Sequence, residues 1–90
     1  RASDTTAAGV MRFLAEARAL LAPPRGVMIR GPVPAAMSRR AGRHHAQLLV
    51  ESPARAALQS FLAAWVPRVG ALPVPRSLRW ALDVDPLELF

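Results

Sequence analysis

Nine prolines divide the chain into short segments and limit where helices and strands can begin and end. A proline has no backbone N–H and disrupts the interior of a helix, so each one favours a boundary over a middle position. Pro23-Pro24 predicts the end of one helix, and Ser52-Pro53 predicts the start of another, as a cap followed by a first-turn proline. Pro67 is expected to interfere with the last turn of that second helix, and Pro86 is expected to end the pairing of the last strand.

Two segments have the spacing of amphipathic helices. The first is expected to run from about Thr5 to Ala22, with Ser3 or Asp4 as its N-terminal cap. The second is expected to run from Pro53 to about Trp65. The apolar stripes consist of Val10, Phe13, Leu14, Ala17 and Leu21 in the first segment and of Leu58, Phe61, Leu62 and Trp65 in the second. One stripe on each helix predicts that each packs a single side on a neighbouring layer.

Three segments alternate between residues expected to face the core and residues expected to face the solvent, as half-buried strands do. Residues 27–33 place Val27 and Ile29 on one face, and residues 45–51 form a second strand. A basic, proline-rich loop from Pro34 to Arg43 is expected to join these two strands as a long-looped hairpin. In the last strand, Leu78, Trp80, Leu82 and Val84 fall on the inward face, whereas Arg79, Ala81, Asp83 and Asp85 fall on the other. Trp65 on the helix stripe and Trp80 on the inward strand face are both predicted to lie in the core. The alternative is that either ring stacks on a base if its face is exposed.

The order helix, strand, strand, helix, strand predicts an α+β fold. We expect a two-layer sandwich with a small, mostly antiparallel sheet and both helices on one of its faces. A complete split β-α-β unit has another strand before the first helix, and Arg1-Ala2-Ser3 is interpreted as the end of it. We therefore expect residues 1–90 to form a single domain. We also expect most of its first strand to be missing. If that strand is central, the sheet would have exposed edges and the chain would be weakly stable or self-associating.

Charge favours an anionic partner. The sequence contains twelve arginines and six acidic residues, which gives a formal net charge of +6. The absence of cysteine excludes disulfides and thiolate metal sites, and no apolar run approaches the roughly 20 residues of a membrane span. Adjacent residues on a strand point to opposite faces, so His44 and His45 do not predict a metal site.

The sequence contains no recognisable catalytic centre. It has neither a phosphate-binding glycine loop ending in lysine nor a Ser/His/Asp arrangement. Asp83 and Asp85 share a predicted strand face with Arg79, and we expect a local ion pair there rather than a pair of catalytic acids. The chain by itself is therefore not predicted to be an enzyme.

Three motifs together resemble one protein family. They are Gly31-Pro32-Val33-Pro34-Ala35, Arg40-Ala41-Gly42-Arg43 and the ending from Leu78 to Phe90, LRWALDVDPLELF. In combination, from about Val27 to Leu87, they resemble the C-terminal domain of the bacterial replication restart helicase, primosomal protein N′ (PriA). The resemblance implies a domain with the β-α-β-β-α-β plan of a small ribosomal-subunit protein, at the end of a longer, cytoplasmic helicase chain. It also implies that ATP, magnesium and zinc bind to other domains and that this chain holds no cofactor.

Arginines gather in the predicted hairpin loop. Arg39, Arg40 and Arg43 lie within five residues, and Arg30 extends the basic side. Guanidinium groups meet phosphate oxygens with forked hydrogen bonds, so these residues are candidates for binding branched or single-stranded DNA. The alternative is a solvated arginine-rich loop that keeps a small domain soluble.

Arg55 and Gln59 lie one turn apart at the start of the second predicted helix. A cation in the first turn opposes the helix dipole, which invites a functional explanation. The family resemblance implies that Arg55 and Gln59 help to hold the acidic C-terminal tail of single-stranded DNA-binding protein, next to the helicase core of the same polypeptide. The alternative is a surface pair with no partner.

Two other functions stay open. One is a free-standing, basic RNA-binding protein of ribosomal type, which would prefer RNA to DNA. The other is a small module whose apolar stripe docks a partner peptide or helix, and whose binding would not depend on salt.

Overall fold

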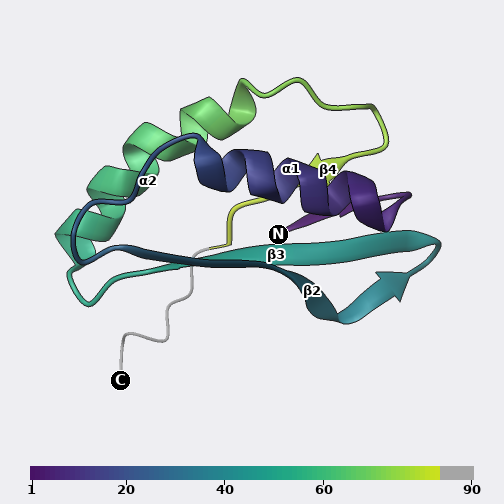
Figure 1. Cartoon of the computed structure of the whole chain (residues 1–90), viewed down its shortest axis with the longest axis horizontal. Coiled ribbons are helices and arrows are strands. Elements are labelled where there is room, and N and C mark those ends of the chain that lie inside the picture. Colours follow the sequence, from purple (N-terminus) through teal and green to yellow (C-terminus); the bar gives the residue numbers. More distant parts are fainter. Residues whose placement is uncertain (84–90) are drawn as a thin grey trace.

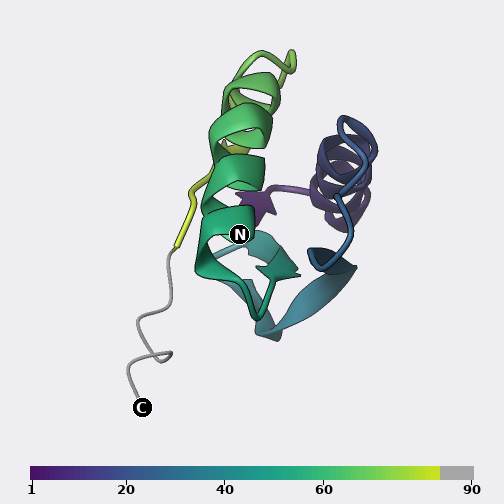
Figure 2. The same ribbon diagram turned by 90° about the vertical axis from the view of Figure 1, so that its left-hand side faces the viewer.

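The fold is a two-layer α+β sandwich. The computed structural model describes the backbone of residues 1–83 and the side chains of residues 1–35 and 41–83. The elements are β1 (Ala2–Asp4), α1 (Ala7–Ala19), β2 (Met28–Arg40), β3 (Arg43–Glu51), α2 (Arg55–Gly70) and β4 (Arg79–Trp80). The strands form a four-stranded antiparallel sheet in the order β2-β3-β1-β4, and both helices lie on one side of it (Figures 1 and 2). The predicted fold class is therefore confirmed.

The first strand is present, so the prediction that it is missing was wrong. Ala2 pairs with Ala46 of β3 on one side and with Trp80 of β4 on the other, which makes β1 central. The backbone of Arg1 and the backbone of Ala81 exchange hydrogen bonds of 3.0 Å, which extend the ladder. Because β1 pairs with both β3 and β4, the missing central strand that would have left exposed sheet edges is present. The interpretation of residues 1–3 as strand residues is confirmed for Ala2 and Ser3, and the strand continues to Asp4.

The predicted loop from Pro34 to Arg43 is instead part of a continuous hairpin. β2 runs to Arg40, and the turn consists of Ala41 and Gly42, whose φ values of 52° and 74° are both positive, as a type I′ turn requires. The ladder shifts register between Arg30 and Val33 and again between Pro34 and Arg39. The prolines are accommodated because β2 is an edge strand with irregular pairing, where missing N–H groups cost least.

The helices differ from prediction mainly at their ends. α1 is capped by Thr6, whose Oγ1 accepts a hydrogen bond from the backbone N–H of Gly9 at 3.0 Å, because Ser3 and Asp4 are already used in β1. α2 begins after Ala54, since the Ser52 hydroxyl accepts a bond from the N–H of Ala54 and forms a turn there. α2 also continues through Pro67 to Gly70. No helix in the described part of the chain is long and apolar enough to cross a membrane.

The core lies between the helices and the sheet. The buried apolar residues are Ala2, Val10, Phe13, Leu14, Ala17, Val27, Ile29, Ala46, Phe61, Trp65, Val69 and Leu78. Trp65 stacks on Phe61 with ring centroids 5.7 Å apart, and its indole Nε1 donates to the carbonyl of Ala17 at 2.8 Å. Trp80 is half-buried and its ring lies 6.3 Å from that of Phe13. Both tryptophans thus belong to the helix side of the sheet, as predicted.

The last strand is shorter than predicted. In the described part of the chain, β4 consists of Arg79–Trp80 and its ladder extends only to Ala81, whereas Leu82 is 46% exposed rather than turned into the core. β4 ends because its neighbour β1 offers only three residues for pairing. The predictions for Val84, Asp85 and Pro86 lie outside the described residues.

Gly31 occupies a position that no larger residue fits. Its φ is +102°, and a Cβ atom built on it would lie 2.9 Å from the backbone oxygen of Gln47. The guanidinium of Arg18 in α1 also donates to the carbonyl of Gly31, so α1 is tied to this irregular part of β2. A residue with a Cβ atom would therefore have both a strained backbone conformation and a clash with Gln47 at this position.

Gly31→Ala is expected to lower the free energy of unfolding by about 2–3 kcal/mol, because strain and a backbone clash act together. Gly42→Ala is the matched control, since Gly42 also has a positive φ of +74° but has open space, with no atom within 4 Å, where a Cβ would lie. The Gly42→Ala variant should lose only about 1 kcal/mol of the free energy of unfolding. Urea unfolding of the two variants measures both values. Equal losses would show that the contact with Gln47 carries no cost.

Candidate nucleic-acid interface

The sheet has one covered face and one open face. Along β3, Ala46 is buried, and Leu48 and Val50 pack against the core, so these residues point toward the helices. Because side chains alternate along a strand, His45 and Gln47 belong to the opposite, open face. Ser3 of β1 and Arg79 of β4 share that face through the pairs Ser3↔His45 and Ser3↔Arg79. The helices leave this face uncovered in Figure 2.

The hairpin brings the predicted arginines to its end. Arg40 pairs with Arg43 next to the turn, and Arg39 pairs with His44 one position further back. The sequence therefore places three arginine backbones around the last two pairs of the β2–β3 ladder. This end of the hairpin lies at the far right of Figure 1, beyond the helices. Such a projecting basic end can reach the backbone of a nucleic acid without a clash from the helical layer.

Arg43 is engaged within the domain. Its Nε donates to the Ser3 hydroxyl at 3.1 Å, and its Nη2 donates to the Ser3 carbonyl at 3.0 Å and to the Ser77 carbonyl. The side chain is half-buried. Arg43 thus joins β3, β1 and the loop before β4 next to the turn of the hairpin.

The buried Asp4 belongs to the same corner of the fold. Its side chain accepts hydrogen bonds from the backbone N–H of Thr5 at 2.6 Å and from the Thr5 hydroxyl at 3.4 Å, and the residue is only 3% exposed. A hydrogen bond from the Ser77 side chain, with those from Thr5 and the charge of Arg43, holds the pKa of Asp4 below its ordinary value despite burial. These contacts were not predicted, because Ser3, Arg43 and Ser77 are far apart in the sequence and have no shared motif.

Arg30 does not join the arginines at the hairpin end. It pairs with Leu49, six residues along β3 from Arg43, which corresponds to a separation of roughly 20 Å. Its Nε lies 2.7 Å from Glu51 Oε1 on the exposed surface. An exposed ion pair of this kind contributes about 0–1 kcal/mol, so Arg30 can exchange Glu51 for a phosphate at little cost.

Arg55 and Gln59 occupy the predicted place at the start of α2. Arg55 is the first residue of the helix, Gln59 follows one turn later, and both are exposed. Within the described part of the chain, this first turn contains no acidic residue and its N-cap makes no side-chain hydrogen bond. In Figure 1 the start of α2 lies at the left, opposite the arginine end of the hairpin. The two predicted binding surfaces are therefore at opposite ends of the domain.

The other candidate residues either have structural partners or do not form a cluster. Asp83 forms an ion pair with Arg1 rather than with Arg79, and the Nε of Arg1 lies 3.1 Å from Asp83 Oδ2. Asp85 lies outside the described residues. His45 pairs with Ser3 and His44 with Asp4, so the two histidines project from opposite faces. In the residues that the structure describes, no group of three or more histidines or acids could hold a metal ion.

Comparison with known proteins identifies the family. A family model described as the primosomal protein N C-terminal domain matches residues 1–87. The replication restart protein PriA of Haemophilus influenzae is 38% identical over 64 residues, which is 71% of this chain and 8% of that protein. The chain thus corresponds to a small fragment of the relative, and by itself it is not expected to be catalytic. From its fold, its arginine hairpin and these matches, the chain belongs to the family of primosomal protein N C-terminal domains.

Proposed function

We propose that this domain binds branched or single-stranded DNA as an accessory part of a replication restart helicase. The observation that carries the proposal is the hairpin end, where the backbones of Arg39, Arg40 and Arg43 lie around the last two pairs of the ladder on a chain with a net charge of +6. Arginine contacts to phosphates position a protein without reading the base sequence, which suits a protein that recognises the structure of DNA. The similarity to the replication restart protein PriA of Haemophilus influenzae supports a role in replication restart.

The four predicted arginines are expected to contribute unequally. Arg39 and Arg40 lie on the edge strand next to the turn, whereas Arg43 already donates to Ser3 and Ser77, and Arg30 lies near the base of the hairpin. Arg39 and Arg40 should therefore carry most of the phosphate binding. Arg43 holds the hairpin end in place and contacts a phosphate with the N–H groups that Ser3 and Ser77 do not use. Arg30 provides an additional contact further along the strand.

The binding test compares forked DNA, single-stranded DNA, duplex DNA and an RNA of matched sequence at two salt concentrations. If four arginines contact single-stranded phosphates, log K should fall with log salt with a slope of about −3. A salt-sensitive preference for the fork or the single strand is the expected result in fluorescence anisotropy. A preference for RNA would favour the RNA-binding alternative of ribosomal type, and binding without salt dependence would favour a module that docks a peptide or helix.

The second part of the proposal is docking of the acidic C-terminal tail of single-stranded DNA-binding protein at Arg55 and Gln59. A guanidinium and the amide N–H groups of the first helical turn both favour a carboxylate at this position. The helicase core of the same polypeptide would supply the remaining contacts, in the bacterial cytoplasm, so the isolated domain is expected to bind weakly.

Arg55→Ala is expected to weaken binding of a tail peptide about fivefold to tenfold, because a charge-assisted hydrogen bond is lost. Arg68→Ala is the matched control, since Arg68 is an exposed arginine in the last turn of the same helix. Calorimetric titration at low salt measures both. Equal affinity of the two variants would remove Arg55 from the docking surface.

A further inference from the structure

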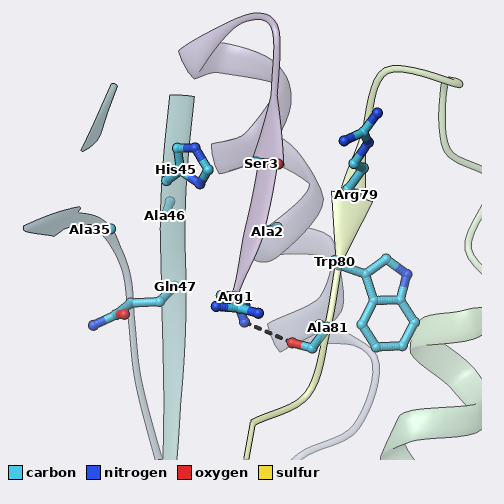
Figure 3. A pocket seen from close by; sticks show the side chains of 10 residues that line it. All are labelled: Arg1, Ala2, Ser3, Ala35, His45, Ala46, Gln47, Arg79, Trp80 and Ala81. Atoms are coloured by element: carbon cyan, nitrogen blue, oxygen red, sulfur yellow. Dashed lines mark hydrogen bonds between the residues drawn. The ribbon is translucent and has the colours of Figure 1, made fainter. Parts of the chain in front are cut away.

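The open face of the sheet contains a hollow that the proposal above does not use. It is a half-open depression with a volume of about 610 Å³. Figure 3 shows side chains from all four strands around it. Those that matter for its chemistry are Arg1, Ser3, Ala35, His45, Gln47 and Arg79.

The hollow exists because small residues separate larger ones. Ser3 lies opposite both His45 and Arg79 in the ladder, and Ala35 lines the β2 side. The ring of Trp80 does not fill the space, because it turns to the helix side, where it packs near Phe13 and Gly70. Figure 3 shows this ring pointing toward α2 and away from His45. A depression in the middle of the sheet is the result.

The lining of the hollow combines positive charge with groups that suit a nucleobase. Arg1 and Arg79 are exposed, and none of the described residues that line the hollow is acidic. Asp83 pairs with the Nε of Arg1, but a guanidinium has five N–H donors, so further donors are left for an anion. His45 provides a ring and Gln47 an amide with both a donor and an acceptor. Rings of this type stack on unpaired bases, and amides bind base edges.

The hollow lies on the same face of β3 as Arg43 near the hairpin end. Arg43, His45 and Gln47 occupy successive open-face positions of β3, and each step is roughly 7 Å. A strand whose phosphates contact the arginines near the turn can therefore follow β3 to the hollow. Duplex DNA cannot offer a base in this way, because its bases are stacked and paired.

We propose that the hollow binds one unpaired nucleotide of a DNA strand, with the phosphate at Arg79 and Arg1 and the base against His45 and Gln47. This inference rests on the proposed function, because the strand held at the hairpin end supplies the nucleotide. It adds a base-dependent contact to binding that would otherwise depend on phosphates alone. The domain would then distinguish single-stranded from duplex DNA by a built site.

The experiment uses two fluorescent oligonucleotides of equal length and charge, one of thymidines and one in which every base is missing. Anisotropy titrations at low salt should show that the chain binds the thymidine strand about tenfold more tightly than the abasic strand. Gln47→Ala should reduce this ratio to about threefold or less, and Arg79→Ala should weaken binding of both strands about threefold to tenfold. Both residues are exposed, so the variants are expected to fold.

Two exposed positions provide matched controls. Leu49→Ala changes the next open-face residue of β3, outside the hollow, and Arg12→Ala removes an arginine from the helical layer. Both should bind the thymidine strand like the unmodified chain. Equal affinity for the two strands, together with salt-sensitive binding, would overturn the inference and leave the proposed function intact. Absence of binding to every DNA would overturn both, and tighter binding of a uridine RNA strand would overturn the assignment to DNA.

Discussion

Replacement of Arg43 by alanine is expected to lower the free energy of unfolding by about 3 kcal/mol. The half-buried guanidinium donates hydrogen bonds to the hydroxyl and carbonyl of Ser3 and to the carbonyl of Ser77. Hydrogen bonds from a charged donor contribute about 1.5–3 kcal/mol each when the partner is left without a substitute. The loss should be large because β1 is only three residues long and depends on such side-chain contacts.

Urea unfolding of the Arg43→Ala variant measures this loss, with Arg79→Ala as the control on the same sheet face. Arg79 is exposed, and its removal should change the free energy of unfolding by less than about 0.5 kcal/mol. Arg43→Lys should recover only part of the stability, because an ammonium group cannot reach both serines with a fixed fork. If Arg43→Ala is as stable as Arg79→Ala, Arg43 does not hold the strands together.

Replacement of Asp4 by asparagine is the other change with a large expected effect, a loss of about 2 kcal/mol at pH 7. Asp4 is buried and accepts hydrogen bonds from Thr5, and its carboxylate lies close to Gly9 in the first turn of α1, where the helix dipole favours a negative charge. A hydrogen bond from Ser77 is the largest cause of the lowered pKa of Asp4. Asparagine lacks the charge and brings N–H donors to a place that needs an acceptor.

The pH dependence of unfolding separates Asp4 from the other acids. A folded-state pKa below the ordinary value means that Asp4 stabilises the fold above pH 3.8 and that this contribution is lost as the pH falls below it. The stability of the unmodified chain should therefore fall more steeply between pH 5 and about pH 2 than that of Asp4→Asn. Asp83→Asn is the control for the removal of one carboxylate elsewhere on the domain. A parallel decline in the unmodified chain and in Asp4→Asn would show that Asp4 is not the responsible group.

The sequence patterns that predicted structure well were the ones with long, local periodicity. The stripe that contains Phe13 and Leu14 and the stripe that contains Phe61 and Trp65 both became the buried sides of helices. Val27 and Ile29 are buried while Met28 between them is 52% exposed, as the alternation predicted. In these segments each residue's neighbours along the chain already determine which face is apolar, so no distant contact was needed.

The errors occurred where distant partners determine the local structure. Three residues are too few for a pattern, and β1 is a strand only because β3 and β4 pair with it on both sides. Pro34 and the basic residues after it indicated a loop up to Arg43, but β3 provides a ladder that an edge strand can follow with shifts in register. α2 continues beyond Trp65 because Val69 is buried against the core, a contact that outweighs the cost of Pro67.

The candidate site was predictable in its residue types but not in its geometry. The spacing of Arg39, Arg40 and Arg43 indicated a basic surface, and the hairpin places their backbones together at its end. That Arg43 also holds Ser3 and Ser77 follows from the order of strands in the sheet, which the sequence does not state. The hollow around Gln47 and Arg79 depends on the same strand order, because it requires residues from four strands to lie side by side.

The measurement that tests the account most directly is the salt dependence of fork binding by the unmodified chain and by the double variant Arg39→Ala/Arg40→Ala. The account predicts a slope of about −3 for the unmodified chain and a slope shallower by about 1.4 for the variant, since two contacts with single-stranded phosphates are lost. Arg12→Ala/Arg68→Ala removes the same charge from the helical layer and should keep the original slope. Equal slopes for the unmodified chain and the hairpin variant would contradict the assignment of DNA binding to the arginine end of the hairpin.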